Sequence, residues 1–313
     1  MTARVTVSVH GLLFLDPDER PVNGRGRGDP LDLYVRCAAA CARSVTAQGH
    51  PFTLVTNDAG ALAARFAALG LPAPALVEWR FALDVPAVPF RAAHRKLELF
   101  RAFAGGGFGS MPALVDLDAV LLRPLTAPPP DVIGGYHITD QVVPAYGAAT
   151  VARDLAAVAG FTPAWPRWWG GEFAIGTPAA FSRLADAVAA CWPRYLAALD
   201  GLHHHGDEIV TSAALALLAR EGVGPVNMAG IKRWWSNRTQ APPTTTLRAA
   251  LDATLLHLPA DKPFLARFAD PARDLAGLPA AYRRHVAIRW PAHRLLAWGA
   301  RATGRPRRFA PRL

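Results

Sequence analysis

The stretch Ala113-Leu-Val-Asp-Leu-Asp-Ala-Val-Leu-Leu-Arg-Pro-Leu125 decides the fold, because it is an apolar run cut by two closely spaced carboxylates. The apolar residues before Asp116 predict a short buried strand that ends near Val115. Asp116 and Asp118 would then emerge at the carboxyl end of that strand, where open α/β sheets bind their ligands. Mg²⁺ and Mn²⁺ are commonly held by one or two carboxylates together with substrate phosphates. The pattern therefore predicts a metal-diphosphate site, and the alternative is an ordinary Asp-containing turn between two strands.

The chain around this stretch alternates between predicted strands and predicted helices. Apolar and amphipathic runs predict them in the order 5–15 (strand), 29–48 (helix), 52–56 (strand), 59–69 (helix), 76–79 (strand) and 91–103 (helix). This order is typical of a parallel sheet with crossover helices. We therefore expect an α/β fold with a central, mostly parallel sheet flanked by helices. The first of these segments is expected to be a core strand and not a signal peptide.

The composition is that of a globular chain. With 313 residues, 51% of them hydrophobic and 19% charged, it can bury a substantial core and differs from a disordered protein. Arg, Asp or Pro interrupts every apolar segment before it reaches the length of a membrane span. The three cysteines, Cys37, Cys41 and Cys191, make neither a disulfide framework nor a zinc site. A reducing cytoplasm is therefore the expected location.

The net charge of +10 is concentrated after residue 266, where eleven arginines face two aspartates. We accordingly divide the chain into a domain over residues 1–265 and a basic, helical extension over residues 266–313, with helices near 280–288 and 292–301. A basic segment implies an anionic partner. We favour peripheral contact with the inner face of a membrane, near a lipid-linked acceptor, over nucleic acid. Loss of vesicle binding after deletion beyond Leu265 would test this expectation.

Two segments carry basic side chains that suit a phosphate or a metal. Lys96 lies toward the first half of the helix predicted over 91–103 and could reach a phosphate, although a solvated surface lysine is the commoner case. His257 ends an apolar strand and precedes Lys262. This order suits a metal ligand followed by a phosphate-binding lysine.

Two further segments carry aromatic and acidic candidates. Trp165-Pro-Arg-Trp-Trp-Gly-Gly-Glu-Phe-Ala-Ile-Gly176 combines rings with glycines, which suits a sugar-binding wall and equally a core tryptophan cluster. Asp207 and Glu208 begin a predicted helix. Acids are favoured there by capping and by the helix dipole alone, so their position does not by itself indicate catalysis.

Taken in order, these motifs resemble those of retaining glycosyltransferases with the A-type fold, the group that includes glycogenin and the bacterial lipopolysaccharide galactosyltransferases. The similar segments are KLELFRAF followed by ALVDLDAVLLRPL, then GGEFAIGTP, GDEIVTSAAL and HLPADKPF. The resemblance extends over residues 5–264. It implies metal-dependent transfer of a hexose-type sugar from a nucleotide-sugar, expected to be a UDP-sugar, to an unidentified carbohydrate or lipid-linked acceptor, with retention of configuration.

The resemblance also implies roles for individual residues. The ligands of Mn²⁺ or Mg²⁺ would be Asp116, Asp118 and His257. The donor would be bound by these aspartates and by Lys96, Lys262 and Asn57. The acceptor would lie over Trp168, Trp169 and Trp234. The catalytic carboxylate would be Glu208, Asp207 or Glu172, and the sequence does not choose among them.

The chain departs from the family pattern at several positions. The spacing from His257 to Lys262 is one residue shorter than usual, and Phe264 replaces a tryptophan. Glu208 replaces a glutamine, and Asp207-Glu208 looks instead like the Asp-Glu pair of the blood-group-type transferases. Two other functions stay open: a sugar-phosphate nucleotidyltransferase, which would need a glycine-rich loop where Gly11 stands alone, and a binding domain without activity that its basic tail recruits to anionic surfaces.

Overall fold

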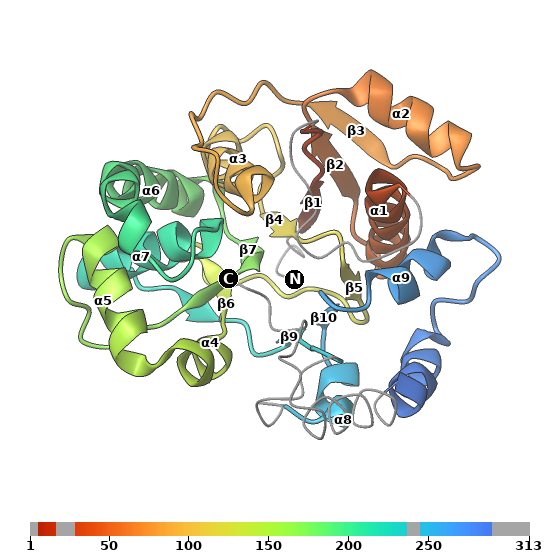
Figure 1. Cartoon of the computed structure of the whole chain (residues 1–313). Helices are drawn as coiled ribbons and strands as arrows, with labels where there is room; N and C mark the ends of the chain where they lie inside the picture. The colour runs from red at the N-terminus through yellow and green to blue at the C-terminus, as the bar shows by residue number, and fades with distance from the viewer. Residues whose placement is uncertain (1–5, 17–28, 237–244, 290–313) are drawn as a thin grey trace, which may run out of the picture.

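The computed structural model describes residues 6–16, 29–236 and 245–289. Its centre is a seven-stranded sheet with the strand order β3-β2-β1-β4-β7-β6-β8 (Figure 1). In that order the strands are Ala75–Glu78, Phe52–Thr56, Ser8–Leu12, Pro112–Val115, Trp169–Ile175, Gly134–His137 and Val226–Asn227. Only β7 runs against its neighbours in this sheet, so the predicted α/β fold with a mostly parallel sheet is confirmed.

The strand order reverses between β1 and β4. From β1 the chain moves outward through β2 to β3 and then returns to β4 on the other side of β1. Such a switch point opens a crevice outside the carboxyl ends of the strands. Asp116 and Asp118 follow β4 directly, so the fold brings them to this crevice.

Helices flank the sheet, with α3, α6 and α7 packed together on one side and α1 on the other (Figure 1). The labelled helices are α1 (Pro30–Ala47), α2 (Ala59–Ala68), α3 (Arg95–Ala104), α4 (Thr139–Tyr146), α5 (Ala148–Ala159), α6 (Pro178–Ala198), α7 (Asp207–Arg220), α8 (Leu247–Leu251) and α9 (Lys262–Leu265). Asp29 caps α1 by accepting a hydrogen bond from the Leu31 amide. The helix predicted from Arg91 begins as a 3-10 turn over Arg91–His94 and becomes α3 at Arg95.

A second, three-stranded sheet continues from the aspartates. It consists of β5 (Ala119–Leu121), β10 (Leu255–His257) and β9 (Ile231–Arg233), in the order β5-β10-β9. Its register places His257 opposite Ala119 on one side and opposite Arg233 on the other. Residues that are far apart in the sequence therefore meet beside Asp118.

The first part of the predicted basic extension packs on the domain. A 3-10 turn over Ala266–Ala269 lies against α1, whose Arg43 donates to the carbonyls of Phe268 and Asp270. Residues 278–289 form a helix. The second predicted helix, 292–301, lies outside the described residues. Deletion beyond Leu265 would also remove the 3-10 turn that packs on α1, so truncation after Arg289 is a cleaner test of vesicle binding. Within the described part of the chain, no helix is long and apolar enough to cross a membrane.

Candidate active site

Asp116, Asp118 and His257 form one cluster at the carboxyl end of β4. One potential ligand atom from each residue lies within 4.8 Å of the other two. His257 Nε2 lies 2.9 Å from Asp118 Oδ1 and 3.7 Å from Asp116 Oδ2. Main-chain bonds hold the arrangement, because the Asp116 amide donates to the Glu172 carbonyl (3.0 Å) and the Leu258 amide to the Asp118 carbonyl (2.9 Å). The structure thus brings the three predicted metal ligands together.

Each aspartate also contacts a lysine. Lys262 Nζ lies 2.5 Å from Asp118 Oδ2, and Lys96 Nζ lies 2.5 Å from Asp116 Oδ1. Lys96 also donates to the Gly171 carbonyl at 3.0 Å. The sequence contains only three lysines, and two of them meet here. Lys96 is therefore not the solvated surface lysine that was the commoner expectation.

Arg233 lies between two of the predicted catalytic carboxylates. Its Nε donates to Glu172 at 2.9 Å, and its Nη2 contacts both Glu172 and Glu208. Glu208 also accepts a hydrogen bond from Trp168 Nε1 at 3.0 Å. On its other side, Glu172 Oε1 lies 3.7 Å from His257 Nδ1. Both glutamates thus share one guanidinium, whose single charge balances only one of the two carboxylates.

Sequence reasoning missed Arg233. The position before Trp234-Trp235 carries no motif, and the chain is rich in arginine. Its role becomes visible only through the register that sets it opposite His257. Arg233 could have been recognised as a site residue if Ile231–Arg233 had been predicted to be a β-strand paired with the strand that ends in His257.

Asp207 faces Lys96 from the first turn of α7, with 3.7 Å between Asp207 Oδ2 and Lys96 Nζ. A Cβ atom at Gly171 would overlap Asp207 Oδ2, and one at Gly170 would overlap the Glu172 carboxylate. The two glycines quoted from the sequence therefore make room for two carboxylates. Burial raises the pKa of Asp207 to about 6, and the nearby Lys96 opposes this shift.

The electrostatics of the site favour a network of charged groups. Burial opposes ionisation of Asp118, but His257 and Lys262 outweigh it, so the pKa of Asp118 lies well below its usual value. Burial likewise opposes the charged form of His257, yet Asp118 beside it raises the pKa of the imidazole to about 9. Burial also opposes ionisation of the two glutamates, but the guanidinium between them lowers the pKa of each.

The ionisable residues that meet at the carboxyl end of β4 are called the charged cluster below. Its carboxylates are Asp116, Asp118, Glu172, Asp207 and Glu208, and its bases are Lys96, Arg233, Lys262 and His257. Five carboxylates face three cations that are permanently charged, so two negative charges remain when His257 is neutral. A divalent cation would balance them.

The residues fit such a cation. Carboxylate oxygens and an imidazole nitrogen suit Mn²⁺ and Mg²⁺ as ligands. His257 turns Nε2 toward the aspartates and Nδ1 toward Glu172. A metal-ligating histidine usually donates its other ring nitrogen to a second carboxylate. Here the 3.7 Å between Nδ1 and Glu172 Oε1 is longer than a hydrogen bond, and Nδ1 has no hydrogen-bond partner among the described residues. We infer that the cluster can hold one divalent cation.

The tryptophans predicted to bind the acceptor are buried. The exposed fractions of Trp168, Trp169 and Trp234 are 1%, 3% and 3%. Trp169 covers Gly135, where a Cβ atom would overlap the indole ring. The alternative expectation for the 165–176 stretch, a core tryptophan cluster, describes Trp168 and Trp169 in this structure, and Trp234 is buried as well. The ring of this stretch that faces solvent is Trp165, which is 84% exposed.

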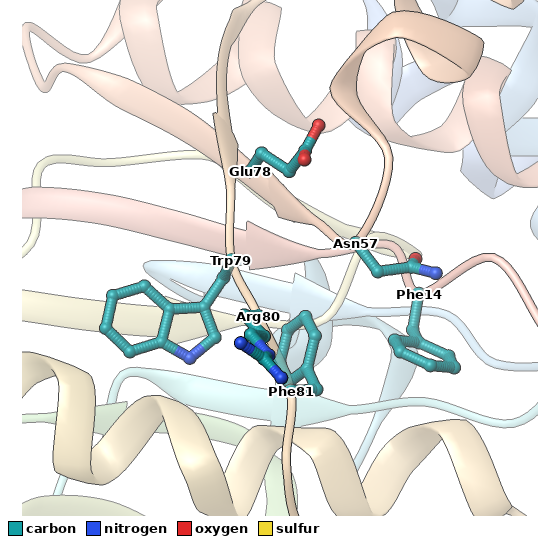
Figure 2. Close-up of a pocket in the computed structure, with 6 residues that line it drawn as sticks. All are labelled: Phe14, Asn57, Glu78, Trp79, Arg80 and Phe81. Atoms are coloured by element: carbon teal, nitrogen blue, oxygen red, sulfur yellow. The ribbon is translucent and has the colours of Figure 1, made fainter.

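Asn57 lines a pocket of about 510 Å³ at the end of β2 (Figure 2). The pocket is also lined by Phe14, Trp79 and Phe81, and the Phe14 and Phe81 rings meet edge to face with 5.3 Å between centroids. The Asn57 amide bonds the main chain of Leu15, accepting at 2.7 Å and donating at 3.1 Å. Because β1 to β4 are parallel, this pocket opens at the same edge of the sheet as the charged cluster.

A scan against protein-family models finds no match for this chain, and no curated protein matches it in sequence. A function must therefore be argued from the chemistry of the charged cluster and from its place in the fold.

Proposed function

We propose that the chain is a metal-dependent glycosyltransferase with the A-type fold, which transfers a hexose-type sugar from a nucleotide-sugar. The observation that carries this proposal is the cluster of Asp116, Asp118 and His257 with a lysine on each aspartate. A site for a bare cation needs no lysines, whereas a site for a cation and a diphosphate uses both kinds of positive charge. Its location at the switch point of the sheet also supports a nucleotide ligand.

Different residues of the site would have different roles. Asp116, Asp118 and His257 would hold the divalent cation, which would neutralise charge on the leaving nucleoside diphosphate. Lys96 and Lys262 lie beside the same carboxylates and would bind the diphosphate oxygens. The aromatic pocket at the ends of β1 to β3 has the size and the rings to receive a nucleoside.

Asp207 is the best candidate for the carboxylate that stabilises the reacting sugar carbon. Glu172 and Glu208 are bound to Arg233, whereas Asp207 faces Lys96 across the cluster. With a pKa of about 6, Asp207 would be mostly ionised at neutral pH. Retention of configuration follows from the family resemblance and stays a prediction.

Thermal unfolding tests the proposal. The midpoint is measured with UDP, GDP, CDP and TDP, each with and without Mn²⁺. One nucleotide should raise the midpoint only when Mn²⁺ is present, by about 2.7 kcal/mol of added stability at a hundredfold excess over its Kd. Asp118→Asn should abolish the shift. The matched control is Asp186→Asn, which changes an exposed aspartate on α6 and should keep the shift.

The outcomes separate the competing functions. If no nucleotide shifts the wild-type midpoint, the transferase proposal is wrong. A shift that survives Asp118→Asn would indicate a nucleotide site elsewhere, as in a binding domain without activity. Release of pyrophosphate from a nucleoside triphosphate and a sugar phosphate would instead identify a nucleotidyltransferase.

A further inference from the structure

The helix over residues 278–289 holds a buried aspartate next to a lysine of the charged cluster. Asp261 is fully buried and immediately precedes Lys262. Its carboxylate accepts hydrogen bonds from Tyr282 Oη (2.6 Å), His285 Nε2 (3.0 Å) and Arg289 Nη1 (2.5 Å). All three donors come from this one helix, the blue helix that follows α9 (Figure 1).

The residues on the other side of Lys262 are held as well. The Phe264 ring lies 5.0 Å from the Tyr282 ring and 4.7 Å from the His285 ring, measured between centroids. From α1, the Cys37 thiol donates to the Lys262 carbonyl at 3.5 Å. Lys262 is thus held through Asp261 immediately before it, through Phe264 two residues after it and at its own carbonyl, while its Nζ reaches Asp118.

We propose that the helix over residues 278–289 is a clamp that positions Lys262 in the charged cluster. The short helix α9 has four residues and begins at Lys262 itself, so it has few internal hydrogen bonds with which to fix that residue. Because Asp261 is bonded to the clamp and immediately precedes Lys262, the clamp fixes the main chain from which the lysine extends. Asp261, Tyr282 and Arg289 are therefore positioning residues, and their consequence for diphosphate binding rests on the proposed function.

Chemical labelling of lysine tests the clamp without any ligand. The full-length protein is treated briefly with an acetylating reagent, and the modification of each lysine is followed by peptide mass spectrometry. Asp261→Asn and, independently, Tyr282→Phe should speed the labelling of Lys262 about fivefold, because they raise the population in which it has left Asp118. Lys232, on the β9 strand, serves as an internal reference and should not change.

Two variants bracket this measurement. Asp118→Asn removes the partner of Lys262 directly and should give the fastest labelling. Arg284→Gln changes an exposed residue on the clamp helix itself and should label like the wild type. If Lys262 is labelled at the wild-type rate in both clamp variants, or if Lys232 accelerates equally, the clamp does not position Lys262 and the proposal is wrong.

Calorimetric titration then connects the clamp to the ligand. With Mn²⁺ present, Asp261→Asn should weaken binding of UDP about tenfold, whereas the affinity for Mn²⁺ alone should stay within about threefold of wild type. A general loss of structure would weaken both. If wild type binds neither Mn²⁺ nor UDP, the proposed function fails, while the labelling result still decides whether the clamp exists.

Discussion

Two buried aspartates, Asp118 and Asp261, are held in opposite ways. Asp118 contacts His257 from β10 and Lys262 from α9, and it lies beside a second aspartate. The three side-chain donors that Asp261 has among the described residues lie on one helix, and one of them, the permanently charged Arg289, matches its charge. The clamp is thus balanced by itself, whereas the charged cluster concentrates carboxylates in excess of cations.

This difference indicates what each region is for. A buried carboxylate whose charge is matched by a cation lowers the stability of the protein little, and its hydrogen bonds fix one segment against another. An excess of buried negative charge costs stability unless a further cation arrives. Clusters of this kind are typical of functional sites, where groups are arranged for a ligand and not for the stability of the free protein.

Of the substitutions that test the difference between the charged cluster and the clamp, Arg233→Gln should lower the free energy of unfolding the most. The change leaves the buried Glu172 and the partly buried Glu208 without their shared cation, and breaking a buried ion pair typically costs about 3–5 kcal/mol. Urea unfolding at pH 8 measures the loss. The deficit should shrink toward pH 5, because the pKa values of the unpaired glutamates rise and protonation then relieves the buried charge.

A neighbouring substitution provides the control for Arg233→Gln. Lys232→Gln removes a cation that lies 5.9 Å from the Tyr136 ring, so it should cost only about 0.5 kcal/mol. Adding Glu172→Gln to Arg233→Gln should restore part of the lost stability. If Arg233→Gln costs less than about 1 kcal/mol, the guanidinium does not hold the cluster together.

Local signals correctly predicted an α/β fold with a mostly parallel sheet. The strand over residues 52–56 matches β2, and Asp29 caps α1 as its place before Pro30 indicates. The two glycines at 170–171 were noticed as a motif, and the structure supplies their physical reason, since each makes room for a carboxylate. Periodicity, capping and turn chemistry act over a few residues, so a single sequence contains them.

The charged cluster was only partly predictable. The two aspartates could be recognised because an apolar run around a pair of carboxylates is itself unusual. The shared partner of Glu172 and Glu208, Arg233, could not be recognised. It depends on how β9 packs against β7 and against the start of α7, segments 61 and 25 residues apart in sequence. The burial of Trp168 and Trp169 depends likewise on packing that no local pattern records.

The second largest effect is a pH dependence confined to the charged cluster. Folding raises the pKa of His257 from 6.5 to about 9, so this stabilisation is complete below pH 6.5 and is lost as the pH rises to 9. The shift corresponds to about 3 kcal/mol in the metal-free protein. Urea unfolding in a chelator between pH 6.5 and 9 measures the slope.

Two comparisons sharpen this pH test. In His257→Gln the slope should largely disappear, because the titrating group is absent. In saturating Mn²⁺ the wild-type slope should also largely disappear, because the metal holds the imidazole neutral in the folded protein and the unfolded imidazole is mostly neutral above pH 6.5. An unchanged slope in His257→Gln would show that His257 is not charged in the metal-free cluster.

The smallest loss of stability should come from a substitution in the clamp. Tyr282→Phe removes one hydrogen bond to Asp261 while His285 and Arg289 remain, so we expect a loss of about 1.5 kcal/mol. This loss, measured by urea unfolding, should be the same at pH 6.5 and pH 9 and should not depend on Mn²⁺. Dependence on either would mean that the clamp and the charged cluster form one electrostatic unit, and the contrast between the two aspartates would then fail.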